Sequence, residues 1–209
     1  MKALRYVCYS LGTALLLAAL FLVLHNLHED RQSGEQAENV LSQLVEEIPE
    51  NVPETTILAS ESYDLYAEYE QPTDPVMETA VVDGQSYIGY LSIPDLEIEL
   101  PVMADWSYPG LKTAPCRYTG NLYTDDLVIA AHNYASHFGK IGTLSIGAEL
   151  IFTDVKGQKH EYAVCEIEQL PGTAVEDMQF GDDWDLTLFT CTLNGQSRVT
   201  VRAERKKQK

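Results

Sequence analysis

The stretch DLTLFTCTLNGQSRVTVRAE, residues 185–204, decides the fold of this chain. Its first part is rich in β-formers, its second part alternates polar and apolar side chains, and Asn194-Gly195 between them predicts a two-residue type I′ turn. Counting outward from that turn places Cys191 opposite Arg198 on the same face, with Cβ atoms roughly 4.5–5.5 Å apart. The sequence therefore predicts a β-hairpin that holds a thiol beside a guanidinium.

The two faces of this hairpin differ in polarity. One face is continuously apolar and is expected to pack on a core; it consists of Leu186, Leu188, Val199, Val201 and Ala203. The face that carries Cys191 is mixed and is expected to meet solvent or a groove; its other members are Thr187, Phe189, Arg198, Thr200 and Arg202. This pattern is typical of a sheet with one face on a core and one accessible face.

Cys191 has the setting of a nucleophile. A nearby cation favours thiolate over thiol, and thiolate is the reactive form. Arg198 stays charged at physiological pH and can donate hydrogen bonds to a carbonyl or an oxyanion. A cysteine nucleophile also needs an acid–base partner. The candidates are His132, which ends the strand-like run LVIAAH at residues 127–132, and His137, which lies in the polar loop that follows.

This pattern resembles the sortases, the membrane-anchored cysteine transpeptidases of Gram-positive cell surfaces. The TLxTC motif of that family matches residues 187–191, its following Arg matches Arg198, and its His after a V-I-A-G-H strand matches His132. The resemblance covers about residues 87–204 and includes four further landmarks in the family's order, at residues 92–94, 100–102, 138–141 and 147–149. The subclass stays open: His132-Asn133 is similar to class B, but residues 169–184 are too short for the helical insertion of that class.

The resemblance implies a transpeptidase mechanism. Cys191 would attack a carbonyl in an LPxTG-like C-terminal sorting signal of an exported protein and form a thioacyl-enzyme. His132 would protonate the leaving amine, and Arg198 would bind the substrate carbonyl and support the oxyanion. Thr190 would assist substrate binding. The acceptor would be an amine of a peptidoglycan precursor or of a pilin lysine.

Two alternative functions stay open beside this one. In a sortase-like cysteine hydrolase, water would resolve the acyl-enzyme. In a non-enzymatic, membrane-tethered surface or pilus-assembly scaffold, Cys191 would be inert. Modification of Cys191 by a thiol reagent in the folded protein would distinguish a reactive cysteine from a structural one.

An apolar run of 19 residues, 6–24, is long enough for one membrane span. Lys2 and Arg5 precede it, and Arg31 is the only Lys or Arg between it and Lys112. The positive-inside rule then places the N-terminus in the cytosol and the rest of the chain outside. A cleaved signal peptide is the alternative, which the length of the run disfavours. We expect a single-pass protein of the cell membrane with an extracellular catalytic domain.

The chain divides into three expected parts. Residues 1–27 form the cytosolic N-terminus and transmembrane signal-anchor, residues 28–83 an acidic linker with one amphipathic helix at about 34–47, and residues 84–209 a sortase-like catalytic β-barrel. The fold class is therefore mainly β, a closed barrel of about 7–8 strands with short helices. The expected strands are residues 87–93, 97–103, 126–132, 149–154, 160–168, 185–191 and 197–204.

The net charge of −18 argues against a nucleic-acid partner, because nothing in the composition neutralises phosphates. No cofactor is expected: Cys116 and His132 lack metal-ligand spacing, and the acidic linker contains no EF-hand pattern. Cys116 and Cys165 are expected to be unpaired core residues, and Cys191 a free thiol.

Overall fold

The structure is a computed structural model, and it describes residues 2–49, 76–179 and 183–207. The middle of the expected linker, residues 50–75, lies outside the described residues. The strands are β1 Ala80–Val82, β2 Gln85–Ile93, β3 Ile98–Met103, β4 Cys116–Thr119, β5 Leu127–Ala131, β6 Glu149–Asp154, β7 Lys159–Pro171, β8 Leu186–Cys191 and β9 Ser197–Arg205. The helices are α1 Lys2–Glu47, η1 Pro94–Leu96, α2 Tyr108–Leu111, η2 Ile141–Thr143 and α3 Val175–Gln179.

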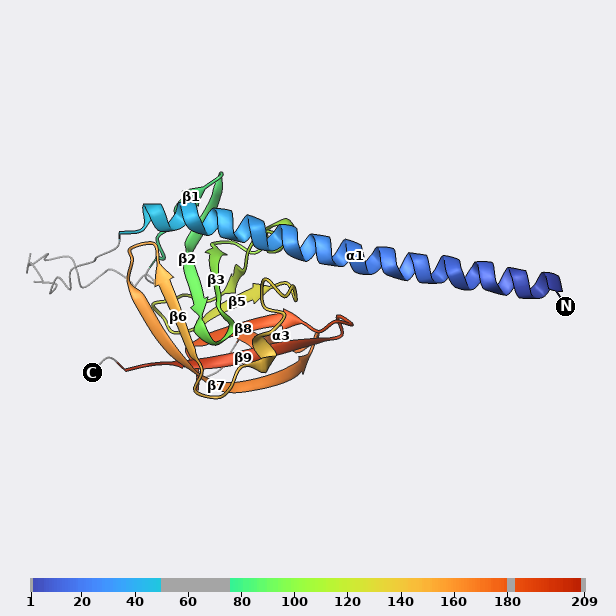
Figure 1. Cartoon of the computed structure of the whole chain (residues 1–209). Coiled ribbons are helices and arrows are strands. Elements are labelled where there is room, and N and C mark those ends of the chain that lie inside the picture. Colours follow the sequence, from blue (N-terminus) through green and yellow to red (C-terminus); the bar gives the residue numbers. More distant parts are fainter. Residues whose placement is uncertain (1, 50–75, 180–182, 208–209) are drawn as a thin grey trace, which may run out of the picture.

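Eight strands close into a β-barrel beside the long helix α1 (Figure 1). Their order is β2-β3-β4-β5-β8-β9-β7-β6, and β6 pairs back with β2 to close the sheet. Most neighbours are antiparallel, but β3 pairs with β4 and β5 with β8 in parallel. The expected closed barrel is confirmed, and all seven expected strands are present.

Two short strands extend the sheet beyond what the sequence predicts. Strand β4 has only four residues, and β1 has three. Neither is long enough for its sequence to show the alternation of polar and apolar side chains that indicates a strand. Strand β1 pairs with the first residues of β2, which brings the last part of the expected linker into the barrel's sheet.

The apolar face of the β8–β9 hairpin lies in the barrel interior, as its pattern predicts. Leu186, Leu188, Val201 and Ala203 are fully buried, and Val199 is partly buried against the same core. Strand β5 contributes Leu127 and Ile129 to this cluster, and β6 and β7 contribute Leu150, Phe152, Tyr162 and Val164. The interior is thus filled by inward side chains from successive strands.

The opposite face of the hairpin is mostly buried, so the expectation that it meets solvent or a groove is wrong for Thr187, Thr200 and Arg202. The reason is visible at Arg202. Its guanidinium lies 3.6 Å from the centre of the Trp184 ring, donates to the backbone oxygen of Asp177 at 2.8 Å, and forms an ion pair with Glu168. Stacking and pairing allow a cation to be covered in this way. Cys191 and Arg198, the pair next to the turn of the hairpin, stay partly exposed.

The hairpin has the predicted register but a different turn. Cys191 pairs with Arg198 as expected. However, the N–H of Gly195 donates to the carbonyl of Thr192, so Leu193 and Asn194 occupy the centre of the turn, and only Gly195 has a positive φ, of 70°. This is a four-residue loop built on a type I turn, not the predicted type I′ turn. The Asn194 side chain accepts from the Thr192 hydroxyl at 2.7 Å, which stabilises this alternative.

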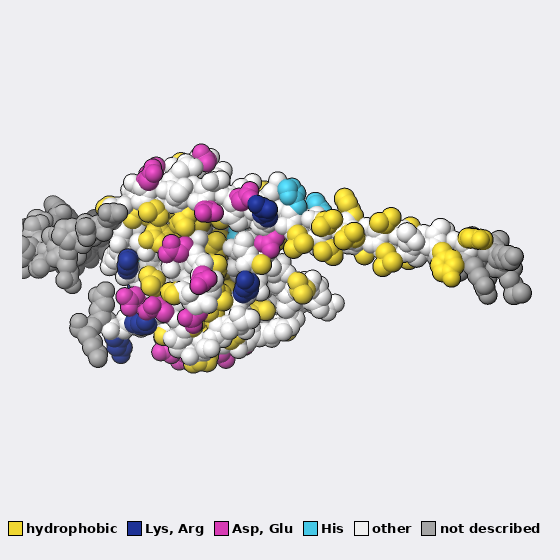
Figure 2. Space-filling view, in the orientation of Figure 1, with side chains coloured by type: hydrophobic (Ala, Val, Ile, Leu, Met, Phe, Trp, Pro, Cys, Tyr) yellow, Lys and Arg dark blue, Asp and Glu magenta, His cyan; other side chains and the backbone are white. Residues whose placement is uncertain are grey.

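Helix α1 joins two elements that the sequence suggests are separate, the apolar run and the amphipathic helix. No Pro interrupts it before Pro49, and the two interior glycines, Gly12 and Gly34, are tolerated. Its last third packs on the barrel, where Ala37, Val40 and Leu44 are buried. Its first half extends away from the barrel with hydrophobic side chains on its surface, and by length and composition it can cross a membrane (Figures 1 and 2).

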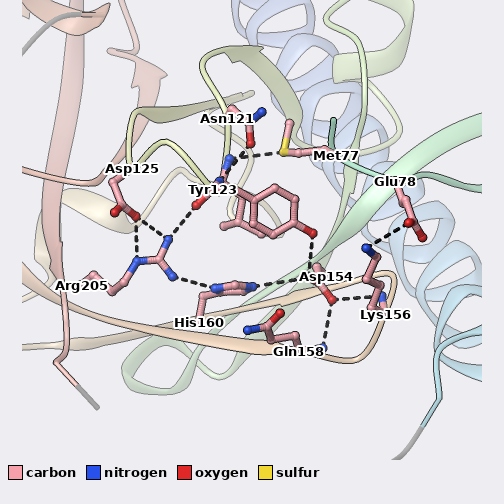
Figure 3. Close-up of polar contacts among 11 residues, drawn as sticks. Met77, Glu78, Asn121, Tyr123, Asp125, Asp154, Lys156, Gln158, His160 and Arg205 are labelled. Carbon is pink, nitrogen blue, oxygen red and sulfur yellow. Dashed lines mark hydrogen bonds and ion pairs between the residues drawn. The ribbon is translucent and has the colours of Figure 1, made fainter. Parts of the chain in front are cut away.

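A polar network fixes the β6–β7 turn near the C-terminal end of α1 (Figure 3). The Asp154 carboxylate is 2% exposed; it accepts the backbone N–H groups of Lys156 and Gln158, both at 2.9 Å, and the Tyr123 hydroxyl at 3.1 Å. Nε2 of His160 lies 3.4 Å from the same carboxylate. Burial alone would raise the pKa of Asp154, but these hydrogen bonds hold it below its ordinary value.

We expect Asp154→Asn to lower the free energy of unfolding by about 2–4 kcal/mol, because an amide cannot accept from all of these donors. The carboxylate's contribution is fully present above the unfolded pKa of about 3.9 and is lost as the pH falls through the lower folded pKa. Thermal melting of the full chain in detergent between pH 3 and 7 measures both effects. Asp95→Asn, an exposed carboxylate in η1, is the control. A melt of Asp154→Asn that matches this control would contradict the assignment.

Candidate active site

The ends of two parallel strands bring His132 and Cys191 to one edge of the sheet. Strands β5 and β8 are in register up to the pair Ala131 and Thr190, and His132 and Cys191 are at this end of each strand. The Thr190 hydroxyl donates to the Ala131 carbonyl at 2.9 Å. This side chain, which the resemblance assigns to substrate binding, therefore also joins the ends of β5 and β8.

Arg198 lies across from Cys191 on β9 and is held by the turn of the hairpin. Its Nη1 atom donates to the carbonyls of Gly195 and Ser197, each at 3.1 Å. Gly172 makes room for the guanidinium, since an added Cβ would lie 3.3 Å from Nη1. The cation is therefore kept beside the thiol by backbone contacts, and no ion pair of Arg198 occurs among the described residues.

His132, Cys191 and Arg198 line one groove of about 550 Å³ on the outside of the barrel. Its floor is Tyr118, Ala130 and Phe189, with the Tyr118 and Phe189 rings edge to face at 5.2 Å. Most of the other lining residues come from the loop around α2, from Gly172 and from α3, and they include Trp106, Tyr108, Leu111, Val175 and Met178. The groove is thus mainly aromatic and apolar, with the three polar groups gathered at one end. This is the usual character of a site that binds and orients a ligand.

A second hollow of about 490 Å³ lies on the other side of the thiol. Cys191 and Thr190 line it together with the hairpin turn and with small residues of the loop after β5 and of η2, including Gly139, Gly142 and Thr143. Cys191 is therefore accessible from two sides.

His132 sits where its imidazole is partly shielded from water. Burial is the main cause that lowers its pKa, the Lys112 ammonium lowers it further, and the Glu29 carboxylate acts in the opposite direction. The Tyr134 ring packs against it at 4.9 Å between ring centres. The neutral form of His132 is consequently favoured near pH 7.

His137, the other histidine candidate, is fully buried and does not line the groove. Burial, reinforced by His132, lowers its pKa to about 4. Its Nε2 atom lies 3.1 Å from the Ser33 hydroxyl of α1. The neutral imidazole is thus favoured at both positions, but only His132 lines a groove together with Cys191.

Helix α1 holds the loop that follows His132, which the sequence did not suggest. The Asp30 carboxylate accepts the backbone N–H groups of Ala135 and Ser136 at 3.1 and 3.0 Å, and the Ser136 hydroxyl at 2.6 Å. Gly34 permits this contact, because a Cβ there would lie 2.9 Å from that of Ser136. More than a hundred residues separate the partners along the chain, and no local pattern marks such a pairing.

The described cysteines other than Cys191 are poorly suited to nucleophilic chemistry. Cys116 is fully buried, and burial raises the pKa of its thiol to about 11. Burial also raises the pKa of Cys165. Cys116, Cys165 and Cys191 are all free thiols, as expected, but Cys165 is partly exposed on β7, so the expectation that it is a core residue is wrong.

Comparison with known proteins agrees with this geometry. The Sortase domain family model matches residues 91–206. The chain is 26% identical to Sortase A of Bacillus anthracis over 161 residues, which covers 75% of this chain and 72% of that protein.

Solved structures show the same barrel. Sortase C1 from Streptococcus agalactiae matches with a TM-score of 0.54 and 24% identity, over 62% of this chain and 72% of that one. Sortase C1 from Streptococcus suis matches with a TM-score of 0.51 and 26% identity, over 59% and 74%. Because the family model covers more than half of the chain, the resemblance noted in the sequence is confirmed, and the chain belongs to the sortase family of cysteine transpeptidases.

Proposed function

We propose that this sortase cleaves an LPxTG-like C-terminal sorting signal of exported proteins and transfers it to an amine, with Cys191, His132 and Arg198 as the catalytic residues. The observation that carries the proposal is the convergence of these three side chains at one end of an aromatic groove. The amine belongs to a peptidoglycan precursor or to a pilin lysine on a Gram-positive surface.

The chemistry proceeds in two displacements. The Cys191 thiolate attacks the carbonyl before the last residue of the signal, and the oxyanion that forms accepts hydrogen bonds from Arg198. The C–N bond breaks as the His132 imidazolium gives its proton to the leaving amine. The incoming amine, which loses a proton to His132, then attacks the thioester, and the thiolate leaves. Thiolate and imidazolium are restored.

The two hollows around Cys191 support separate places for the two substrates. The aromatic groove, with Trp106, Tyr118 and Phe189, suits the apolar residues of an extended sorting peptide. The second hollow has a mixed lining that includes Phe138 and Val199 as well as Thr143, and it gives the amine a path to the opposite side of the thioester. The Thr190 side chain borders this hollow and assists binding there.

The N-terminal region anchors the enzyme. Residues 1–27 form the cytosolic end and the membrane span, residues 28–83 connect it to the catalytic barrel at residues 84–209, and the barrel is extracellular. The apolar first half of α1 and the basic residues Lys2 and Arg5 before it support this orientation.

Arg198→Lys should lower kcat/KM at least tenfold, about 1.4 kcal/mol of transition-state stabilisation. Lysine keeps the charge but loses the planar fork that can hold a carbonyl and an oxyanion together. The assay is cleavage of a quenched LPxTG-type peptide by the full chain in detergent, with an added amine. Arg117→Lys, a partly exposed arginine on β4, is the control. Near-full activity of Arg198→Lys would show that this residue contributes only its positive charge, and it would contradict the role of the guanidinium fork.

Removal of the charges around His132 should move the acid limb of the pH profile in opposite directions. The Lys112 ammonium lowers the pKa of His132, so Lys112→Gln should shift that limb to higher pH; Glu29 raises it, so Glu29→Gln should shift the limb to lower pH. The measurement is kcat/KM from pH 4 to 10, with Lys159→Gln at the far end of the barrel as control. Shifts of the same sign in both variants would exclude His132 as the group behind that limb.

The products test the function itself. With a sorting peptide and excess amine, a transpeptidase yields peptide joined to the amine, whereas a cysteine hydrolase yields only the free acid. A panel of peptides that differ in the first and last residues of the motif defines the signal. Conversion of the panel to free acid at saturating amine would support the hydrolase in place of the transferase.

A further inference from the structure

Helix α1 connects the proposed membrane span to the active site with little distance between them. The helix is unbroken from Lys2 to Glu47, and exposed apolar side chains continue along it to Leu27, which is 59% exposed. Its first polar contact with the barrel is at Asp30. Six residues separate Leu24, the end of the apolar run, from Asp30, which is about 9 Å along a helix. The barrel therefore begins within about two turns of the span.

The tip of the β8–β9 hairpin lies beside the last turns of the apolar run. A hollow of about 400 Å³ is lined on the α1 side by Val23, Asn26 and Leu27 and on the barrel side by Tyr134 and Leu193, among others. Leu193 is thus level with the end of the apolar run. In Figure 1 the tip of this hairpin points in the same direction as the N-terminal half of α1.

This tip has the composition of a membrane-contacting loop. Leu193 is 97% exposed, more than any other large hydrophobic side chain among the described residues. Residues 186–197 include no charged side chain, although the chain carries a net charge of −18. A neutral loop with a projecting leucine is stabilised when that side chain leaves water, and the loop brings no charged side chain to the bilayer surface.

From this placement we infer that Leu193 inserts at the surface of the bilayer that α1 spans, together with the Val23–Leu27 side of the helix. The inference rests on the membrane anchoring in the proposed function. Leu193 follows Cys191 by two residues, at most about 7 Å between Cα atoms. The reactive thiol is therefore held close to the membrane surface.

Quenching by spin-labelled lipid tests the depth of the tip. Trp106 and Trp184, the two tryptophans of the chain, are replaced by Phe, and a single tryptophan is then placed by Leu193→Trp, Val81→Trp or Phe21→Trp. Val81 is 59% exposed on β1, which packs against α1 near Val40 and Leu44 and so lies far along the helix from the span. The full chain is reconstituted in phosphatidylcholine vesicles with and without 5-doxyl phosphatidylcholine.

The expected result is quenching of Leu193→Trp at least half as strong as that of Phe21→Trp, with blue-shifted emission, and no quenching of Val81→Trp. Quenching of Phe21→Trp without quenching of Leu193→Trp overturns the inference and leaves the anchoring intact. Absence of quenching at Phe21→Trp overturns the anchoring and the inference with it. If the Phe replacements unfold the barrel, each of the three Trp substitutions is made in a chain that keeps Trp106 and Trp184. The increase in quenching over the chain without the added tryptophan then gives the same comparison.

Discussion

Cys191→Ala is expected to abolish acyl transfer, with residual turnover below about one per cent of wild type. The thiolate is the only group in the proposed mechanism that forms a bond to the substrate carbon, and no other described cysteine lines the groove. The barrel should stay folded, because the side chain is partly exposed and its loss leaves only a small cavity. The assay is cleavage of a quenched LPxTG-type peptide with added amine, accompanied by thermal melting.

Cys165→Ala provides the matched control for this variant. Cys165 is also a partly exposed free thiol, but it lies on β7, and its Sγ atom contacts the backbone oxygen of Arg202. This variant should retain full activity. Turnover by Cys191→Ala above about one per cent, in a protein that melts like wild type, would remove Cys191 as the nucleophile.

His132→Ala should reduce kcat/KM by at least a hundredfold, since general acid–base catalysis typically contributes 10²–10⁴-fold. The bell-shaped pH profile should be replaced by a single rise, because the imidazolium that protonates the leaving amine is gone and only thiolate formation at Cys191 still titrates. The two limbs of the wild-type profile belong to the coupled His–Cys pair, so this rise should not coincide with the wild-type acid limb. The measurement is kcat/KM from pH 4 to 10.

Substitutions of two other histidines serve as controls that separate a catalytic role of His132 from a structural one. His28→Ala, on the exposed surface of α1, should behave as wild type. His137→Ala should lower the melting temperature, because it empties a fully buried position and leaves Ser33 without its imidazole partner, while the bell shape of the pH profile persists. Loss of the bell shape in His137→Ala, with its retention in His132→Ala, would reverse the assignment.

The parts of the fold that the sequence predicted are those with local, periodic signals. The alternating run after Gly195 and the β-formers before Asn194 predicted a hairpin, and the position of the turn fixed the register of Cys191 and Arg198. The predicted register is correct although the predicted turn type is wrong, because the observed four-residue loop also places Cys191 opposite Arg198. The strand that delivers His132 was equally clear from its continuous apolar run.

The parts that escaped prediction depend on contacts between distant residues. The burial of Arg202 needs Trp184 and Glu168, which lie on other elements and carry no shared pattern. The contact of Asp30 with the loop at Ser136 joins segments more than a hundred residues apart. As a result, the sequence located the candidate catalytic residues but gave no sign that α1 reaches the loop beside them.

The most direct test of the account is the position of the covalent intermediate. The full chain in detergent is incubated with an LPxTG-type peptide without amine, quenched in acid, digested and mapped by mass spectrometry. The account predicts that the N-terminal part of the cleaved peptide is attached to Cys191 through a thioester that hydroxylamine releases, and that added amine prevents its accumulation. A peptide adduct on Cys116 or Cys165, or cleavage by a chain whose Cys191 is never acylated, would contradict it.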